Sequence, residues 1–148
     1  MQLSTEEWSA ALVSGVLLVM LAAMWFLPAR VDLNIRDGAL IVRPRGVDVL
    51  WCLRGRIEIP VASVAMVRVV GRAQAPRPLL RWPGTGLAGV LTAGSFGAGD
   101  ARVFWDARRA DRLLLISCRL GSEYKSLVLE VADPDATAAR LNAELVAS

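Results

Sequence analysis

The chain has 148 residues, enough for one domain of ordinary size; 55% of them are hydrophobic and 21% are charged. It has no histidine and two cysteines, which excludes imidazole catalysis, histidine metal ligands, a disulfide framework and a zinc cluster. All 17 Lys and Arg lie at or after Arg30, whereas Glu6 and Glu7 are the charged residues before it. Because the mean hydropathy of +0.46 is high for a soluble protein, we expect part of the chain to lie in lipid.

The run from Trp8 to Leu27 predicts a transmembrane helix. Seventeen of its 20 residues are apolar and none is charged, and as a helix it would be about 30 Å long, the thickness of the hydrocarbon core. A capping-box pattern at Ser4–Glu7 precedes it and Pro28 follows it, as helix start and stop signals do. Trp8 and Trp25 lie near its two ends, where interfacial anchors are expected.

A cleaved signal peptide is the main alternative for this run. It would need a basic start, a shorter apolar core and a small-residue cleavage site, whereas this chain starts acidic and leaves the run through 25–28, Trp-Phe-Leu-Pro. The positive-inside rule then orients the chain by the arginines that follow, at positions 30, 36, 43 and 45. We expect residues 1–29 to form an outer tail and a single transmembrane helix (about 8–27), and residues 30–148 to form a cytoplasmic domain at the cell membrane.

Two small residues lie one turn apart inside the apolar run. Ala11 and Gly15 form a small-xxx-small pair, which allows close approach of a second helix and hence weak homo-oligomerisation. Such pairs are also common in lone anchors, so both interpretations stay open.

Short alternating runs after the helix predict a mainly-β domain of about seven antiparallel strands. A hairpin is indicated by Asp37-Gly38 between the runs 31–35 and 39–42. In the run 112–120, alternation places Leu114, Ile116, Cys118 and Leu120 on one face. Further strand-like runs are 47–53, 56–60, 64–70, 90–96, 101–106 and 124–131, with a turn at 61–63 and a Pro/Gly-rich stretch at 71–89.

The end of the chain changes from strand to helix periodicity. Asp133 can cap a helix, and Pro134 and Asp135 suit its first turn. Ala138 and Leu141 would share one face at helical spacing, together with Leu145. We therefore expect a C-terminal helix over about 134–147 that closes one open end of a split barrel.

This order of elements resembles the pleckstrin-homology-like (PH-like) domains of small bacterial proteins, over about residues 31–146. The resemblance is carried by the hairpin 35–42, by Ile-Pro-Val-Ala-Ser-Val at 59–64, by Trp-Pro-Gly-Thr-Gly-Leu at 82–87 continuing to Ala-Gly-Ser-Phe at 93–96, and by Asp-Pro-Asp at 133–135. In such families an N-terminal membrane helix is common. The resemblance implies a PH-like split barrel and a membrane address, and it does not imply phosphoinositide binding.

Positive charge is concentrated in the half of the domain that follows the membrane. Residues 30–81 contain ten arginines and four acids, and residues 59–99 contain no acid at all. Candidate contacts to anionic lipid or to an acidic partner are therefore Arg30, Arg68, Arg72, Arg77 and Arg81. The alternative is topology-setting charge on solvated strand faces. Nucleic-acid binding is not expected, since stacking aromatics do not interleave with these arginines.

No catalytic, cofactor or metal site is expected. Residues 84–89 match G-x-G-x-x-G, but a strand-like run follows them instead of the helix that a dinucleotide site needs. Cys52 and Cys118 lie in apolar strands and are expected to be buried, inert thiols. The charged segment 106–112 is interpreted as a solvated loop, and Lys125 as an exposed lysine beside a turn.

These observations favour a membrane-anchored, non-catalytic module that binds a protein or peptide at the inner face of the membrane. One alternative is a module that responds to anionic lipid through its arginine-rich half. Another is a small accessory subunit held in a larger membrane complex by its helix.

Overall fold

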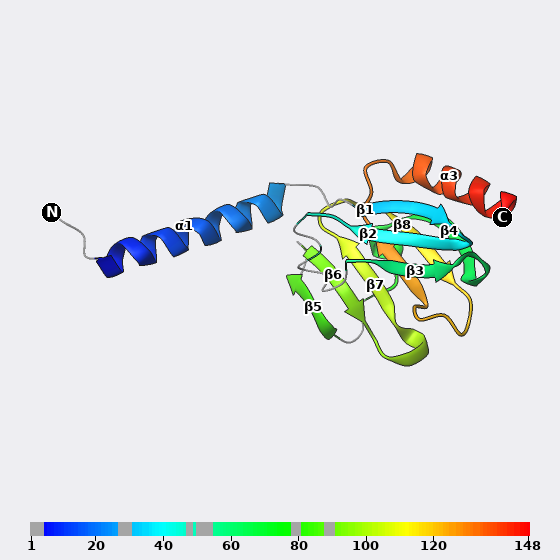
Figure 1. The fold of residues 1–148 in the computed structure, drawn as a ribbon, viewed down its shortest axis with the longest axis horizontal. Coiled ribbons are helices and arrows are strands. Elements are labelled where there is room, and N and C mark those ends of the chain that lie inside the picture. The colour runs from blue at the N-terminus through cyan, green and yellow to red at the C-terminus, as the bar shows by residue number, and fades with distance from the viewer. Residues whose placement is uncertain (1–4, 27–30, 47–48, 50–54, 78–80, 88–90) are drawn as a thin grey trace.

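The computed structural model describes residues 5–26, 31–46, 49, 55–77, 81–87 and 91–148, with the backbone alone for 24–26, 81–87 and 91–93. One helix precedes a mainly-β domain that ends in a second helix (Figure 1). The elements are α1 (Thr5–Phe26), β1 (Val31–Arg36), β2 (Ala39–Pro44), β3 (Ile57–Pro60), β4 (Val64–Gly71), β5 (Arg81–Leu87), β6 (Leu91–Phe96), β7 (Val103–Ala107), β8 (Arg112–Cys118), β9 (Ser126–Leu129) and α3 (Pro134–Ala147), with short 3₁₀ turns at Val61–Ser63, Arg72–Gln74 and Gly99–Ala101.

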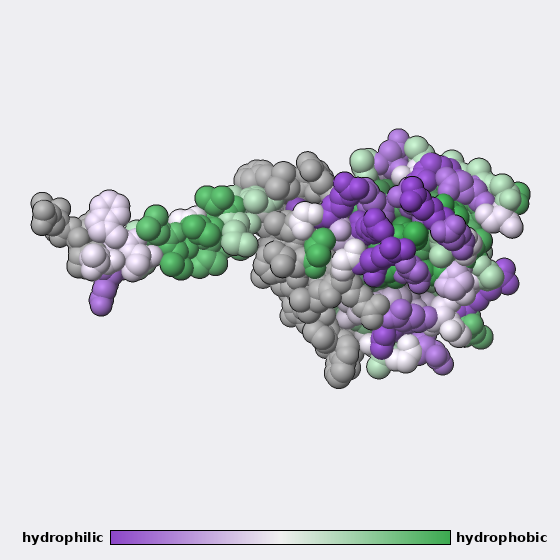
Figure 2. Space-filling model, viewed as in Figure 1, coloured by the Kyte–Doolittle hydropathy of each residue, from purple (hydrophilic) through white to green (hydrophobic). Residues whose placement is uncertain are grey.

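Helix α1 begins at Thr5, one turn before the predicted start at Trp8, and ends at Phe26. It is long and apolar enough to cross a membrane, and none of its 19-residue apolar span, Thr5–Ala23, is buried against the protein. Figure 2 shows the hydrophobic middle of this helix projecting from the domain. The expected apolar helix is therefore confirmed as a helix, while the Ser4 half of its capping box and the Pro28 stop lie outside the described residues.

The first three strands form one antiparallel sheet in the order β1-β2-β3. Asp37 and Gly38 join β1 to β2 with positive φ angles of 51° and 72°, the mirror-image turn that Asp-Gly favours. Leu33, Leu40 and Ile57 point to the same inner face and are buried. The predicted hairpin is confirmed.

The other six strands form a second sheet in the order β4-β8-β9-β7-β6-β5. Its neighbours are antiparallel except for β7 and β9, which run parallel with Val103 opposite Ser126 and Asp106 opposite Leu129. The expectation of about seven strands, all antiparallel, is therefore wrong on both counts. The chain crosses from β7 to β8, which pairs with β4, before it returns between β8 and β7 as β9, and this insertion makes the parallel pair.

Two segments differ from their predicted conformation. The Pro/Gly-rich stretch contains a strand, β5, because its backbone pairs with β6 across a register shift between Arg81 and Gly84. Val49 is not in a strand: its N–H donates to Gly46 O at 3.4 Å, a local helical bond. Alternation in the expected strand 47–53 places Val49 on one face with Val47, Trp51 and Leu53, and these three lie outside the described residues.

The two sheets face each other across one core that contains residues of both, including Val42, Phe104, Ile116 and Leu127. A second core covers the outer face of the six-stranded sheet. Its buried members are Val70, Ala75, Phe96, Val103, Trp105, Ala107, Leu113, Leu115 and Val128. Ala75 comes from the segment after β4, which therefore lies over this face.

Helix α3 packs against the first core along the edge where β1 and β4 approach each other (Figure 1). Asp133 caps it by accepting the N–H of Ala136 at 2.9 Å. Ala138 and Leu141, on the inner face of the helix, are buried. The predicted helix and its apolar stripe are confirmed. No ladder joins the two sheets within the described ranges, so the domain is an open sandwich with a helix along one edge.

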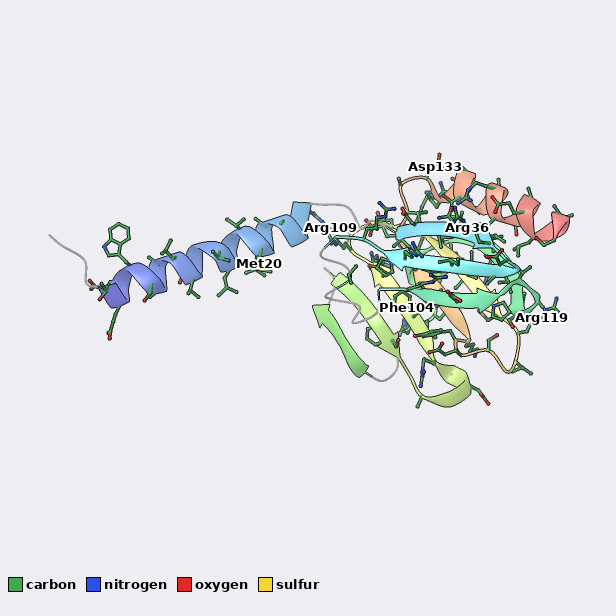
Figure 3. The ribbon with its side chains drawn as sticks, viewed as in Figure 1. Met20, Arg36, Phe104, Arg109, Arg119 and Asp133 are labelled. Carbon is green, nitrogen blue, oxygen red and sulfur yellow. The ribbon has the colours of Figure 1, made fainter. Side chains whose placement is uncertain are left out.

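The domain has two ends, the entry end at which the chain arrives from α1 and the far end opposite to it. The entry end contains Val31, which is at most about 18 Å from Phe26, the last residue of α1, because four residues separate the two. It also contains the β7–β8 loop with Arg109. The far end contains the turn at Gly38, whose carbonyl accepts the N–H of Val61, and the β8–β9 turn with Arg119, whose N–H donates to Ser63 O. Figure 3 labels Arg109 and Arg119 at these opposite ends.

Candidate interaction site

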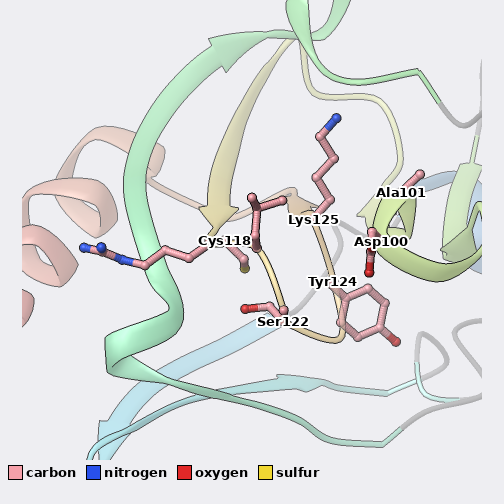
Figure 4. Close-up of a pocket in the computed structure, with 9 residues that line it drawn as sticks. Asp100, Ala101, Cys118, Ser122, Tyr124 and Lys125 are labelled. Carbon is pink, nitrogen blue, oxygen red and sulfur yellow. The ribbon is translucent and has the colours of Figure 1, made fainter.

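A hollow of about 340 Å³ lies at the far end of the domain (Figure 4). Its lining comes from the 3₁₀ turn before β7, the end of β8 and the β8–β9 turn. The lining residues are Asp100, Ala101, Cys118, Arg119, Leu120, Gly121, Ser122, Tyr124 and Lys125.

Backbone hydrogen bonds join the three walls of this first hollow. The N–H of Cys118 donates to Lys125 O at 2.9 Å, and the N–H of Lys125 donates to Arg102 O at 2.7 Å. The N–H of Arg119 donates to Ser63 O at 2.7 Å, which ties the same turn to the start of β4. The hollow is thus a fixed feature of the strand ends.

Tyr124 forms a rigid side of the hollow. Its ring is 1% exposed and packs edge-to-face on Phe104, with centroids 5.9 Å apart and planes at 73°. Its hydroxyl lies 3.0 Å from the hydroxyl of Ser95, so the phenol already has a hydrogen-bond partner. Tyr124 therefore shapes the hollow and fixes its position on β6 and β7.

Leu120 projects from the β8–β9 turn at the rim of the hollow and is 98% exposed. The sequence placed it on the buried face of β8, and this expectation is wrong because β8 ends at Cys118. Gly121, with a φ of 89°, turns the chain directly after it. One exposed leucine is ordinary on a protein surface, but this one borders a hollow.

The chemistry of the first hollow suits binding. Burial raises the pKa of the Cys118 thiol from 9.0 to about 11, so at neutral pH it is a protonated, weakly nucleophilic group. The side chains of Asp100, Ser122 and Lys125 add a carboxylate, a hydroxyl and an ammonium. Among the described residues, no group of three or more His, Cys, Asp and Glu side chains is placed to hold a metal ion.

A second hollow, of about 320 Å³, lies on the outer face of the six-stranded sheet and shares Ala101 and Lys125 with the first. One wall is the segment at Pro76 and Arg77, which crosses that face. The lining residues are Pro76, Arg77, Phe96, Gly97, Ala101, Val103, Lys125 and Ser126. They include two cations and no acid.

Of the five arginines that the sequence singled out, the three whose side chains the structure describes lie in different environments. Arg68 is exposed on β4, and Arg77 is exposed beside the second hollow. Arg72 is half-buried and donates to two backbone carbonyls, those of Ala110 at 3.0 Å and Arg108 at 2.7 Å. Arg30 lies outside the described residues, and Arg81 is described only as backbone in β5.

Three candidate residues of the expected membrane helix, Trp8, Ala11 and Gly15, lie on one exposed strip of α1. Trp8 is 58% exposed. Ala11 and Gly15 form the bottom of an apolar groove of about 430 Å³, which is also lined by Trp8, Leu12, Val16, Val19 and Met20. The side chain of Trp25, the second expected anchor, lies outside the described residues.

The charged segment 106–112 is solvated only in part: Arg109, Asp111 and Arg112 are exposed, as expected of a loop, whereas two of its charged residues are buried. Asp106 is fully buried and Arg108 is 2% exposed, because they continue the inward-facing alternation of Phe104 on β7. Glu130, 8% exposed, accepts the N–H groups of Arg108, Arg109 and Ala110 through one oxygen. Sequence reasoning missed this buried polar arrangement, and the period-2 alternation through residues 104, 106 and 108 was the signal that could have indicated it.

The described residues thus define an apolar helix followed by a mainly-β domain with two hollows at its far end. No protein-family model, no curated protein and no solved structure matches this chain.

Proposed function

We propose that the protein is a membrane-anchored, non-catalytic interaction module whose domain binds a protein or peptide partner. The observation that supports this is the contrast between α1 and the domain. The apolar span of α1 is exposed throughout, whereas the two cores of the domain are assembled from its own strands and α3. A helix that contributes nothing to either core, and whose apolar surface is unfavourable in water, is suited to serve as a membrane anchor.

We further propose that the domain is PH-like. Two facing sheets followed by a C-terminal helix on one open edge support this assignment. Nine strands and the parallel β7/β9 pair depart from the simple antiparallel pattern. The PH-like part of the proposal therefore concerns the architecture and carries no ligand with it.

The proposed orientation places the domain in the cytoplasm of a bacterial cell. It rests on the arginines that follow α1, of which Arg36 and Arg43 are exposed on the three-stranded sheet. Reporters of compartment fused to each terminus test it. We expect the C-terminal reporter to be active only in the cytoplasm, and a C-terminus outside the cell would overturn the orientation.

Cross-linking in intact membranes tests the binding function. We expect a defined partner to be captured by the full chain and, equally, by a variant whose α1 is replaced with an unrelated anchor, because the proposed contacts are in the domain. Loss of the partner on this replacement would instead identify an accessory subunit that assembles through its helix. Capture by α1 alone would contradict the proposal outright.

Anionic lipid is a second candidate ligand, and one observation favours it. Arg109, on the β7–β8 loop, and Arg43, near the end of β2, are both exposed at the entry end, the end that the short link holds near the membrane. Cations at an anionic surface each contribute about 1 kcal/mol. We expect hydrogen exchange of the β7–β8 loop to slow in nanodiscs that contain anionic lipid. Equal exchange in neutral and anionic nanodiscs would remove this candidate.

A further inference from the structure

We propose that the second hollow binds an acidic peptide segment of a partner protein, with an apolar side chain in the hollow and carboxylates paired to Arg77 and Lys125. This inference rests on the proposed binding function and specifies the site and the class of partner.

The floor is apolar and closely packed. Phe96 and Val103 are 5% and 7% exposed and belong to the core on the outer face of the sheet. Together with Ala101 and Pro76 they offer an apolar surface that a partner side chain can cover. A volume of about 320 Å³ equals roughly ten liquid water molecules, which is room for a leucine or phenylalanine side chain.

The charged groups at the hollow have one sign. Arg77 and Lys125 are exposed, and neither makes an ion pair with any residue in the described ranges. Asp100 lines the first hollow but not the second. Figure 4 shows the Lys125 ammonium pointing away from the side chain of Asp100. Two cations over an apolar floor with no acid in the lining are complementary to an acidic segment with an apolar anchor.

The backbone at both cations is held in place before any partner arrives. The indole N–H of Trp105 donates to Pro76 O at 3.1 Å, and Ala75 is buried, so the chain is fixed immediately before Arg77. On the other side, Lys125 is bonded through both its N–H and its carbonyl to neighbouring segments. Little ordering of the backbone is then needed on binding, which favours affinity.

The position of the hollow favours a protein over the membrane. Gly97, Val103 and Ser126 lie at the far ends of β6, β7 and β9, whereas the chain reaches α1 from the entry end. The five residues of β7 alone separate the two ends by about 15 Å. The hollow is therefore better placed for a protein than for lipid. Because an anionic membrane could still bind the same two cations, the experiment also tests anionic vesicles.

A peptide-library selection on the full chain in neutral-lipid nanodiscs tests the inference. The probe is a displayed library of random 12-residue peptides. We expect the selected peptides to be enriched in Asp and Glu next to Leu, Ile or Phe. We expect Arg77→Gln/Lys125→Gln to weaken binding of these peptides about tenfold and to remove most of its salt dependence. Ala101→Trp, which fills the hollow, should weaken them as well.

The matched control is Arg36→Gln, which neutralises an exposed arginine on β1 that lines neither hollow and should leave peptide binding unchanged. Thermal unfolding of every variant checks that the fold is intact. Failure to select acidic peptides, or equal binding by Arg77→Gln/Lys125→Gln, would overturn the inference. So would binding of vesicles containing one-third anionic lipid that depends on the same two residues, since the site would then be a lipid site.

The failure of this inference can be told apart from failure of the proposed function. If a partner cross-links to the domain in membranes and Arg77→Gln/Lys125→Gln leaves that product unchanged, the function stands and the assigned site is wrong. If the domain cross-links to no partner, the function itself is wrong.

Discussion

Arg72 and Glu130 both hold the β7–β8 loop: Arg72 donates to its backbone carbonyls, and Glu130 accepts from its backbone N–H groups. The guanidinium of Arg72 donates to the carbonyls of Arg108 and Ala110, at 2.7 and 3.0 Å. One carboxylate oxygen of Glu130 accepts the N–H groups of Arg108, Arg109 and Ala110, at 2.6, 3.0 and 3.2 Å. A backbone bond from Arg72 N–H to Asp111 O, at 2.7 Å, joins β4 to the same loop. The entry end of the domain is thereby closed by polar contacts.

Glu130→Ala should destabilise the domain strongly. It leaves three N–H donors without their acceptor in a partly buried loop, and each unsatisfied buried donor costs about 1–3 kcal/mol. We expect a loss of about 2–4 kcal/mol in the free energy of unfolding, since water will satisfy part of the loop. Denaturant titration of the full chain in detergent measures it.

The control for this prediction is Glu58→Ala. The Glu58 side chain is 52% exposed and pairs with Arg56 on the surface of the three-stranded sheet. Such exposed pairs contribute about 0–1 kcal/mol, so the control should stay within that range. Equal losses for the two substitutions would show that Glu130 does not hold the loop.

Arg72→Ala should also destabilise the domain, by about 1–3 kcal/mol, because two carbonyls of the loop lose a charged donor. Arg68→Ala, on the exposed surface of β4, the strand that precedes Arg72, should change stability by less than about 0.5 kcal/mol. Denaturant midpoints of the two variants provide the comparison. If Arg68→Ala proved the more damaging, the assignment of Arg72 as a structural residue would be wrong.

The sequence predicted the elements whose signals are local. Asp37-Gly38 determines its own turn, and Asp133-Pro134 with the stripe at Ala138 and Leu141 determines α3, since dihedral preference, capping and periodicity act within a few residues. The parallel β7/β9 pair could not be predicted, because nothing in the segment Ser126–Leu129 states which strands it lies between. Sheet order is a property of the whole chain.

The candidate site was harder to predict than the fold. Composition identified Arg68, Arg72 and Arg77 alike as surface cations, yet the structure gives Arg72 a structural role and places Arg77 beside a hollow. The difference lies in long-range contacts: Arg72 meets carbonyls 36 and 38 residues away along the chain. Lys125 was recognised as exposed, but its neighbours across the sheet were not visible in the sequence.

Helix α3 is held to both sheets by two side chains from its middle. The guanidinium of Arg140 donates to Leu33 O on β1 at 2.9 Å, and the amide of Asn142 donates to Val67 O on β4 at 3.0 Å. Each bond satisfies a carbonyl on an edge strand. The helix therefore covers two strand edges that could otherwise pair with another chain.

Asn142→Ala should loosen this attachment without unfolding the domain. We expect a loss of about 1 kcal/mol, the contribution of one hydrogen bond, and faster amide exchange in α3. Asn34→Ala is the matched control, because Asn34 is exposed on β1. Hydrogen exchange read by mass spectrometry compares the two variants, and unchanged exchange of α3 in Asn142→Ala would contradict the proposed attachment.

The Cys118 thiol should react slowly with alkylating reagents. Burial disfavours the thiolate and raises the pKa of Cys118 to about 11, so only about one thiol in 1,000 is ionised at pH 8. In a Cys52→Ala background we expect the alkylation rate of the folded chain to rise about tenfold per pH unit from pH 8 to pH 10. In denaturant the alkylation rate of the same chain should level off near pH 9. A rate that levelled off near pH 9 in the folded chain too would show that the thiol is not shielded.

Because the folded pKa of Cys118 lies above the unfolded one, this group also makes the domain less stable as the pH rises from about 9 towards 11, and Cys118→Ala should remove that part of the pH dependence.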